Sequence, residues 1–288
     1  MSSCSNEFNS TIGGLNEHSA VMGKIDRRKA TKEDYEKNGL KSIGRILIVT
    51  ADGKHVANVC TAVQVELEIV LASSHCLADA NDKSKYTSNI IMFELGINGD
   101  VDTAIHRTRL SYYDAKKDLG LDKELTPYQA GESISKDWTL LEMDNPKFGV
   151  PWMEVWHYED FEELKKLKLK VAGYSPAFSD GNHITIQENC RFRDTIEKNV
   201  YTHDCDTSGT DSGAPLYTCD PKGKCIIHAI NQGPKMHIPA DSTFAETSNK
   251  TGHKYYKDPD GEDTVHHRVN RAVGVGAFYP AFKKIASW

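Results

Sequence analysis

The 288-residue chain lacks the long apolar runs and the positive charge that mark two large classes of protein. No apolar run approaches the roughly 18 residues that a membrane helix needs, so we expect no membrane span. The formal net charge is −6 at pH 7, which gives nucleic acid no general electrostatic attraction. Internal repeats and low-complexity tracts are absent as well. With 39% hydrophobic and 26% charged residues, the composition is typical of a globular protein with a substantial core.

The first twenty residues lack the apolar centre of a signal peptide. We interpret residues 1–20 as a polar tail or the remnant of a pro-segment, and residues 21–288 as the folded domain. If the protein is exported, its signal has been removed from this sequence.

The cysteines form no CxxC pair, which argues against a zinc ribbon and a thioredoxin-like centre. Cys219 and Cys225 flank a turn-rich stretch between two strand-like runs, and a hairpin there would bring the two thiols within bridging distance. Any single cysteine could instead be a buried free thiol. Six of the seven can pair, leaving Cys4 in the tail, and this favours an oxidising compartment, secreted or periplasmic. The six are Cys60, Cys76, Cys190, Cys205, Cys219 and Cys225.

A bound metal is not indicated by the acidic stretch 258–263. It is too short for a calcium loop and Pro259 interrupts it, so a solvated turn is the better interpretation. The stretch belongs to a polar, charged segment, 234–268, whose length is typical of a functional lid or a disordered insertion. We expect no cofactor and no metal, and we expect this long loop to border a substrate cleft.

Short apolar or alternating runs, each bounded by turn-forming residues, predict many strands. Helical periodicity is confined to residues 159–169 and 280–288, and the second segment starts with Pro280, which the first turn of a helix tolerates. Many short strands with turns between them favour a sandwich or a barrel. The predicted strands are residues 43–49, 56–65, 65–72, 90–97, 138–143, 183–187, 224–230 and 271–278.

Three local patterns carry the chemistry. Ser212 lies in the glycine-flanked sequence TDSGAP, which allows the backbone to approach a substrate carbonyl closely. His75 follows an apolar strand in LASSHC, where a disulfide between Cys60 and Cys76 would fix the histidine loop to its neighbour. Asp137 begins DWTLL at the start of another predicted strand.

Serine is a poor nucleophile at neutral pH unless a base takes its proton. A histidine can do so, and a buried aspartate can hold its tautomer and stabilise the imidazolium. Each residue alone has an ordinary explanation: a core histidine, an aspartate at a strand entry, a serine in a loop. Together, in the order His75, Asp137, Ser212, they predict a catalytic triad.

On these motifs the chain resembles the trypsin-like, chymotrypsin-fold serine proteases. LASSHC is similar to the histidine motif TAAHC, DWTLL to the aspartate motif, and TDSGAP to GDSGGP. The chain resembles the bacterial glutamyl-endopeptidase branch most closely, through residues 21–27, 171–176, 206–207 and 270–273. The resemblance covers about residues 21–288 apart from the 234–268 loop.

The resemblance implies an all-β fold of two antiparallel six-stranded barrels with a C-terminal helix, divided near residues 145–150. It implies peptide-bond hydrolysis through an acyl-enzyme, with His75 as general base, Asp137 as its orienting residue and Ser212 as nucleophile. The backbone amides of Thr210 and Ser212 would form the oxyanion hole. The resemblance assigns substrate binding to Asp206, Thr207, Ile230, Asn231 and Gly233, with residues 231–233 as a short strand that pairs with the substrate backbone.

The first departure from the family pattern is Thr210, which stands where the family has glycine. A β-branched residue resists the unusual dihedral angles that glycine tolerates. The oxyanion hole would then need substrate or a partner to form, or it would be slack.

The second departure concerns the specificity pocket. Thr207 matches the pocket threonine of the glutamate-specific branch, but Ile230 stands where that branch has its pocket histidine, with His228 two residues earlier. Asp206 would suit a basic P1 residue, yet the glutamate-specific enzymes also carry an acid there. The P1 preference stays open.

The third departure concerns activation. Asp211 precedes the nucleophile, as in trypsin-type enzymes whose new N-terminal ammonium pairs with that acid. Cleavage before Val21 would supply such an ammonium. The alternative is a tail without a role.

The sequence therefore predicts a secreted, monomeric serine endopeptidase that acts on proteins or peptides. The alternative is a protease-fold binding protein that is catalytically impaired or activated by a partner, which Thr210 favours. An esterase is a weaker alternative, because the G-x-S-x-G elbow and the order Ser, Asp, His are both missing.

Overall fold

The computed structural model describes residues 26–50, 56–95, 106–146, 149–238 and 267–286, apart from short gaps at 115–116, 120, 122–124, 130–131, 176–177 and 180. The predictions for the 1–20 tail, Cys4, Val21 and most of the 234–268 loop lie outside these residues. In the described part of the chain, no helix is long and apolar enough to cross a membrane.

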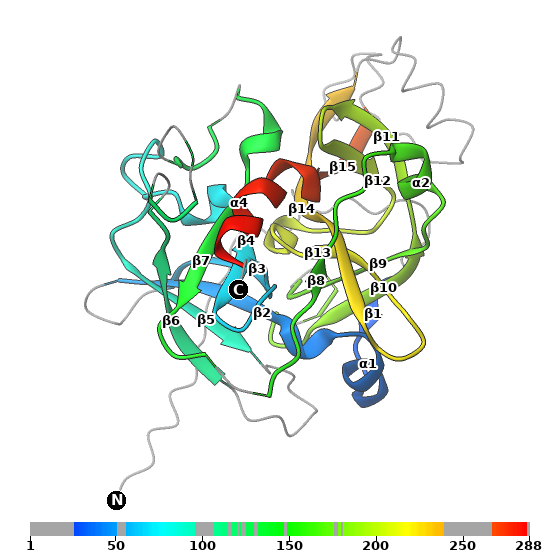
Figure 1. The fold of residues 1–288 in the computed structure, drawn as a ribbon, viewed down its shortest axis with the longest axis horizontal. Helices are drawn as coiled ribbons and strands as arrows, with labels where there is room; N and C mark the ends of the chain where they lie inside the picture. The colour runs from blue at the N-terminus through cyan, green and yellow to red at the C-terminus, as the bar shows by residue number, and fades with distance from the viewer. Residues whose placement is uncertain are drawn as a thin grey trace, which may run out of the picture.

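The first half of the chain forms a closed six-stranded antiparallel barrel, on the left in Figure 1. Alternating strand residues such as Ile46, Phe93 and Leu141 are buried inside it, as a period of two requires. The strand order is β2-β3-β4-β7-β6-β5. The strands are β2 (Ile43–Val49), β3 (Val56–Gln64), β4 (Ile69–Ala72), β5 (Ile90–Leu95), β6 (His106–Tyr112) and β7 (Thr139–Met143).

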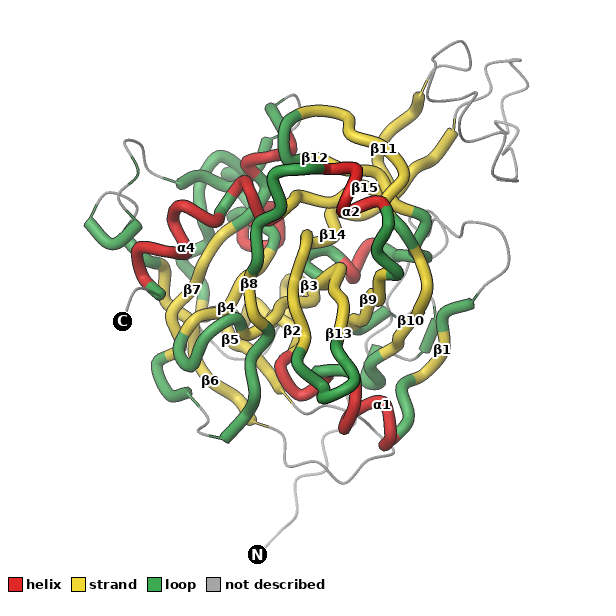
Figure 2. The backbone as a smooth tube through the Cα atoms, turned by 45° about the vertical axis from the view of Figure 1, so that its right-hand side comes forward, coloured by secondary structure: helices red, strands yellow, loops and turns green. Residues whose placement is uncertain are grey.

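The second half, together with β1 from before the first barrel, forms a nine-stranded sheet in the order β1-β10-β9-β13-β14-β15-β12-β11, with β8 paired to β14 off this path. Figure 2 shows β8 running beside β14, and this pairing is parallel. The strands are β1 (Arg28–Lys29), β8 (Glu154–Val155), β9 (Leu169–Gly173), β10 (Thr185–Cys190), β11 (Phe192–Glu197), β12 (Val200–His203), β13 (Pro215–Cys219), β14 (Cys225–Ile238) and β15 (His267–Gly274).

The all-β prediction is confirmed, and the structure adds a difference between the halves. The first barrel closes, whereas the described strands of the second sheet form an open half-barrel. The helices are short: α1 (Lys32–Lys37), α2 (Phe161–Lys165) and α4 (Tyr279–Ile285), with 3₁₀ turns η1 (Leu40–Ser42), η2 (Ser74–Leu77), η3 (Ile134–Lys136), η4 (Gly209–Asp211) and η5 (Val275–Ala277).

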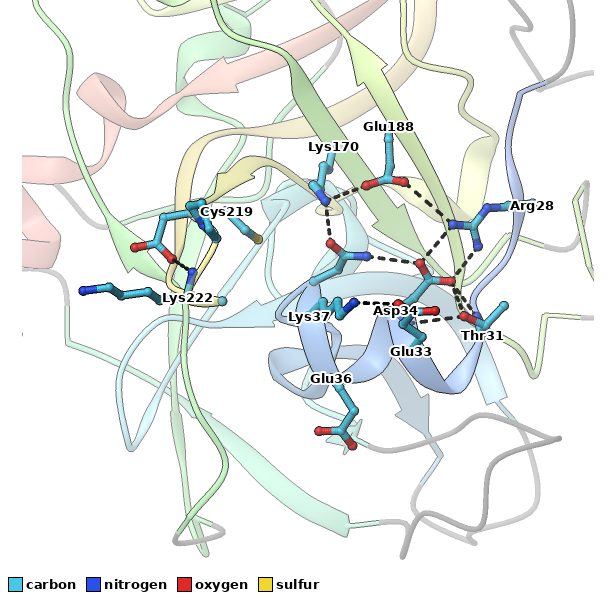
Figure 3. Close-up of a pocket in the computed structure, with 14 residues that line it drawn as sticks. Arg28, Thr31, Glu33, Asp34, Glu36, Lys37, Lys170, Glu188, Cys219 and Lys222 are labelled. Carbon is cyan, nitrogen blue, oxygen red and sulfur yellow. Dashed lines mark hydrogen bonds and ion pairs between the residues drawn. The ribbon is translucent and has the colours of Figure 1, made fainter.

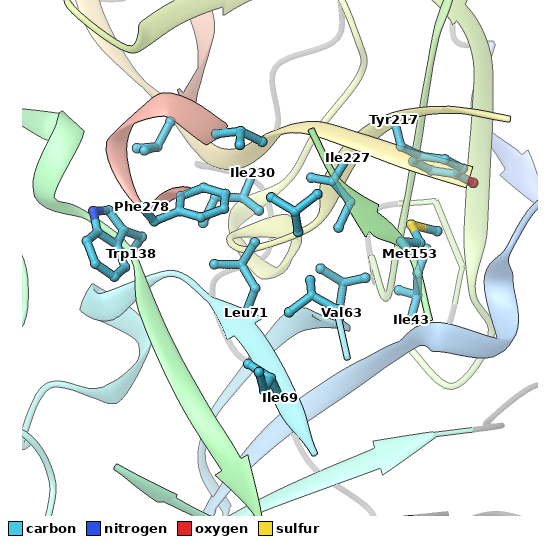
Figure 4. Close-up of a cluster of buried hydrophobic side chains, with 14 of the residues drawn as sticks. Ile43, Val63, Ile69, Leu71, Trp138, Met153, Tyr217, Ile227, Ile230 and Phe278 are labelled. Atoms are coloured by element: carbon cyan, nitrogen blue, oxygen red, sulfur yellow. The ribbon is translucent and has the colours of Figure 1, made fainter. Parts of the chain in front are cut away.

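A buried apolar cluster joins the two halves (Figure 4). Leu71 and Trp138 come from the first half, Ile230 from β14, and Phe278 from the turn before α4. The rings of Trp138 and Phe278 lie 5.9 Å apart, within the range of favourable aromatic contacts. Because both halves contribute to one core, the residues at the rim between them are held in fixed relative positions.

Three disulfides connect the six cysteines that were expected to pair. Cys60–Cys76 ties β3 to η2, the turn that carries His75, and Cys219–Cys225 closes the hairpin between β13 and β14. The third bridge, Cys190–Cys205, ties the end of β10 to the segment after β12. Two of these bridges border the segments that carry the predicted catalytic residues.

Candidate active site

The structure brings His75, Asp137 and Ser212 together between the two halves. His75 lies in η2 directly after β4, Asp137 ends η3 before β7, and Ser212 follows η4 before β13. The Nδ1 atom of His75 is 2.7 Å from Oδ2 of Asp137, and its Nε2 atom is 2.9 Å from Oγ of Ser212. Both distances are those of hydrogen bonds.

Asp137 is buried and accepts hydrogen bonds at both carboxylate oxygens. Its Oδ1 accepts from the backbone N–H of His75 (3.0 Å) and from the hydroxyl of Ser74 (2.9 Å). Its Oδ2 faces the imidazole, so an ionised Asp137 favours the tautomer with hydrogen on Nδ1. The Nε2 atom of His75 is then free to accept the proton of Ser212, as a general base must.

Thr61 of β3 holds the loop that carries Ser212 against the first barrel. We call this loop, residues 206–214, the nucleophile loop. The Thr61 N–H donates to the carbonyl of Ser212 (3.1 Å), and its hydroxyl donates to the carbonyl of Thr210 (3.2 Å). Gly213 has φ +83°, and a Cβ there would lie 2.2 Å from the Thr61 carbonyl oxygen. Glycine is therefore required beside the nucleophile, both for its dihedral angle and for the close approach of the two backbones.

A carbonyl, and not an amide, faces the nucleophile from the peptide bond between Gly209 and Thr210. The hydroxyl of Ser212 lies 3.2 Å from the Gly209 carbonyl oxygen. Across a trans peptide the N–H points opposite to the C=O, so the Thr210 amide points away from the hydroxyl. Among the described residues, only Asn189 and Asn199 are non-glycine residues with positive φ, so Thr210 keeps the ordinary backbone of a 3₁₀ turn.

This geometry affects both the oxyanion hole and the proton of Ser212. A hydroxyl has one proton, so donation to Gly209 competes with donation to His75. In this arrangement the Thr210 amide does not point into the predicted hole. The departure seen at Thr210 in the sequence thus has a direct structural counterpart.

The predicted pocket residues Asp206 and Thr207 are fully buried at the start of the nucleophile loop. The Asp206 carboxylate accepts from the N–H of Asp26 (3.2 Å), and its own N–H donates to Gln187 (2.6 Å). Among the described residues, the Thr207 hydroxyl has no hydrogen-bond partner. An unpaired buried hydroxyl is costly unless a ligand meets it.

The placement of Ile230 in the pocket is corrected by the structure. Ile230 is buried in the apolar cluster with Leu71 and Trp138 (Figure 4). The next residue, Asn231, faces the site: its Nδ2 donates to the Asp211 carbonyl (2.9 Å), and its Oδ1 is 3.1 Å from Nε2 of His203. Neighbouring residues of a strand point to opposite faces of the sheet. Ile230 therefore points into the core, whereas Asn231 points toward the candidate site.

Gly233, two residues after Asn231, lies close to Ser212. A Cβ on Gly233 would be 3.8 Å from Oγ of Ser212. Gln232, which lies between Asn231 and Gly233 in the strand, donates from Nε2 to the carbonyl of Asp137 (2.6 Å). Sequence reasoning placed Gln232 only in the strand expected to pair with substrate, and it gave no role to Thr61 or to the buried Arg27, which bonds Asp211. Their partners lie far away in the sequence, so no local pattern could have identified them.

Two buried histidines outside the predicted triad, His203 and His228, have lowered pKa values. Burial lowers the pKa of His203 and of His228 to about 4 each. His228 is hydrogen-bonded to the hydroxyl of Thr218 (2.9 Å), and its ring contacts Tyr158. Both are neutral near pH 7 and act as structural hydrogen-bonding groups.

The described residues give no support for a metal site. Two groups bring potential ligand atoms together, one around His75 and one around Asp204. Each includes two cysteines that form a disulfide, Cys60–Cys76 or Cys190–Cys205, so neither offers a thiolate.

A separate cavity of about 620 Å³ lies next to α1, away from the triad (Figure 3). Its charged side chains neutralise one another: Arg28 pairs with Asp34, and Lys170 with Glu188. Burial acts to raise the pKa of Asp34, but hydrogen bonds from Arg28 and Thr31 outweigh it and hold this pKa at about 2. The cavity holds no group aligned for proton transfer and is not the candidate site.

Comparison with solved structures identifies the fold. A structure of a Glu endopeptidase covers 93% of this chain and 100% of its own, with a TM-score of 0.59 and 14% identity. The protease Anisep from Arthrobacter nicotinovorans covers 91% of this chain and 100% of its own, with a TM-score of 0.54 and 14% identity. No family model and no curated protein matches the chain.

Proposed function

We propose that this chain, which has the chymotrypsin-like protease fold, is a serine endopeptidase that hydrolyses peptide bonds through an acyl-enzyme. The observation that carries the proposal is the chain of hydrogen bonds from Asp137 to His75 to Ser212, at 2.7 and 2.9 Å. This is the arrangement that activates a serine hydroxyl.

In the proposed reaction, Oγ of Ser212 attacks the scissile carbonyl while Nε2 of His75 takes its proton. Asp137 holds the imidazole and stabilises its positive charge. His75 then gives the proton to the leaving amine, and the Ser212 ester remains. A water molecule, deprotonated by His75, hydrolyses that ester and restores the serine.

The amides of Thr210 and Ser212 would stabilise the developing oxyanion. For Thr210 this requires the Gly209–Thr210 peptide to turn over, because its carbonyl now faces Ser212. Substrate binding or a partner would drive that change. The same observation favours the second candidate function, a protease-fold binding protein that is impaired or activated by a partner.

Substrate recognition is proposed at Asp206, Thr207, Asn231 and Gly233. Gly233 lies beside the nucleophile, so its backbone would pair with the substrate chain. The buried Thr207 hydroxyl offers an unused hydrogen bond. Cleavage of a peptide library would establish the P1 residue.

The remaining proposals concern the context of the enzyme. Three disulfides fit an oxidising compartment, so we propose a secreted or periplasmic monomer that needs no cofactor. Residues 1–20 would form a tail or pro-segment, and the 234–268 loop would select substrates. Trimming that loop would then change the cleavage profile of a peptide library, and an unchanged profile would refute this role.

The first experiment is labelling with a fluorophosphonate, which reacts only with an activated serine. We expect the native chain to be labelled and Ser212→Ala to stay unlabelled. His75→Ala, which keeps the nucleophile but removes its base, should also lose labelling. Labelling that persists in Ser212→Ala would refute the assignment, and an unlabelled native chain would favour the binding protein.

A further inference from the structure

The most extensively bonded charged side chain near the nucleophile is Arg27, which precedes β1. Its Nη2 donates to Oδ1 of Asp211 at 2.6 Å and its Nη1 to Oδ2 at 3.1 Å, and both side chains are fully buried. Its Nη1 also donates to the Asp206 carbonyl (2.7 Å) and its Nε to the Thr185 hydroxyl (2.8 Å). Such a fork of parallel hydrogen bonds fixes geometry as well as charge.

Asp211 is the residue immediately before the nucleophile, so its position sets that of Ser212. Besides Arg27, its Oδ2 accepts from the N–H (2.8 Å) and the hydroxyl (3.2 Å) of Ser208. The carboxylate therefore receives four hydrogen bonds, and a carboxylate has about four lone-pair sites. Three of the four bonds fall on Oδ2, and a buried guanidinium already pairs the negative charge, so no additional ammonium group is needed to neutralise Asp211.

We propose that Arg27 is the positioning residue of the nucleophile loop, in place of a newly formed N-terminal ammonium. The inference rests on the proposed serine-protease function and deepens it. It changes the expectation drawn from the sequence, because cleavage before Val21 is then not needed to pair Asp211.

The surroundings of Arg27 are built to hold its guanidinium. A Cβ on Gly173 of β9 would lie 2.8 Å from Oδ1 of Asp211, so the absence of a side chain there makes room for the ion pair. The ring of Phe178 covers the guanidinium, with 5.2 Å between the guanidinium carbon and the ring centroid.

The chain on either side of Arg27 is fixed separately. On one side the N–H of Asp26 donates to Asp206, and on the other Arg28 pairs with Asp34 and Glu188 (Figure 3). Arg28 is half-exposed and is not bonded to the nucleophile loop. It therefore provides a matched control, since its removal takes away the neighbouring arginine and leaves Asp211 paired.

The test compares Arg27→Ala, Arg27→Lys and Arg28→Ala in the full chain. We expect Arg27→Ala to lower the fluorophosphonate labelling rate at least a hundredfold. Free guanidinium ion should then raise the labelling rate of Arg27→Ala at least tenfold. Arg27→Lys keeps the charge but loses the fork, so it should retain an intermediate rate. Arg28→Ala should label like the native chain.

Amide hydrogen exchange in residues 206–214 provides a readout that does not depend on activity. We expect Arg27→Ala to exchange at least tenfold faster there, with exchange in β2–β7 unchanged, and guanidinium to reverse the effect. Acetylating the amino terminus, or removing residues 1–20, should leave both readouts unchanged.

The outcomes separate the two proposals. If the native chain is not labelled but the exchange results hold, the proposed activity fails and the positioning role stands. If labelling and loop exchange in Arg27→Ala equal those of the native chain, the role of Arg27 is refuted. Faster exchange throughout the molecule, without rescue by guanidinium, also refutes it and shows general destabilisation. A requirement for a free amino terminus at residue 21 would contradict it as well.

Discussion

At the scale of single residues, the predicted triad is hydrogen-bonded throughout, whereas the proposed oxyanion hole is not assembled. The hydrogen bonds of His75 have catalytic lengths, whereas the Gly209 carbonyl faces the Ser212 hydroxyl. The difference originates at Thr210, whose Cβ disfavours the positive φ that would turn the peptide over. If the chain is the proposed serine endopeptidase, the side chain at this position would therefore control how readily the oxyanion hole forms.

Replacing Thr210 by glycine should release this restriction. We expect Thr210→Gly to raise the fluorophosphonate labelling rate and kcat about tenfold or more, because one oxyanion donor is worth on the order of 10²–10³ in turnover. Thr210→Ala, which keeps the Cβ, is the control and should gain little. Stopped-flow labelling and steady-state kinetics measure both variants, and equal rates for glycine and alanine would contradict the explanation.

The residues that could be predicted from the sequence are those whose neighbours in the chain form a motif. His75, Asp137 and Ser212 each lie in such a segment, and the structure brings them together. Asn231 was predicted as part of the substrate-pairing strand, whereas Ile230, predicted for the specificity pocket, is buried in the core. Arg27 was not predicted because its partner Asp211 is 184 positions away.

At the scale of elements, strands with a regular apolar pattern were predicted most accurately. The prediction for residues 43–49 matches β2, and that for 90–97 overlaps β5 (Ile90–Leu95). Polar strands such as β11 were missed. Only one of the six residues of β11 is buried, so its sequence has no regular apolar alternation. The helix expected over 159–169 is shortened to α2, since Leu169 begins β9 and is buried as a strand residue.

The disulfide beside His75 connects element stability to activity. We expect the double variant Cys60→Ala/Cys76→Ala to lose about 3 kcal/mol of unfolding free energy, as the entropy of a loop of this length implies. Its kcat should fall as well, because η2 carries His75. Urea unfolding and kinetics on one peptide substrate measure the two effects.

The matched control is Cys219→Ala/Cys225→Ala, which opens a short hairpin with a sequence separation of 6. It should lose about 2 kcal/mol and keep its kcat. If both double variants lose activity to the same extent, the effect on the first is one of general stability and not of His75 positioning.

At the scale of the whole molecule, two buried histidines should make stability depend on pH. Burial lowers the pKa of His203 and His228 to about 4, against about 6.5 in the unfolded chain. The unfolded state therefore binds more protons below pH 6.5, and stability falls as the pH decreases from about 6.5 to about 4. By pH 5 the loss is about 2 kcal/mol for each histidine.

Urea unfolding between pH 4 and pH 8 tests this expectation. His228→Gln keeps a hydrogen-bonding group near Thr218 but cannot titrate, so the slope of stability against pH should be about half that of the native chain. An unchanged slope would show that His228 does not titrate on unfolding.

The bond between Arg27 and Asp211 also has a consequence for the order of events during synthesis. A ribosome makes Arg27 early, but its partner is 184 residues later, and Thr61 likewise waits for Ser212. Until residue 212 has emerged, the growing polypeptide contains a base and no nucleophile. The proposed proteolytic activity would therefore arise only after residue 212 has been translated.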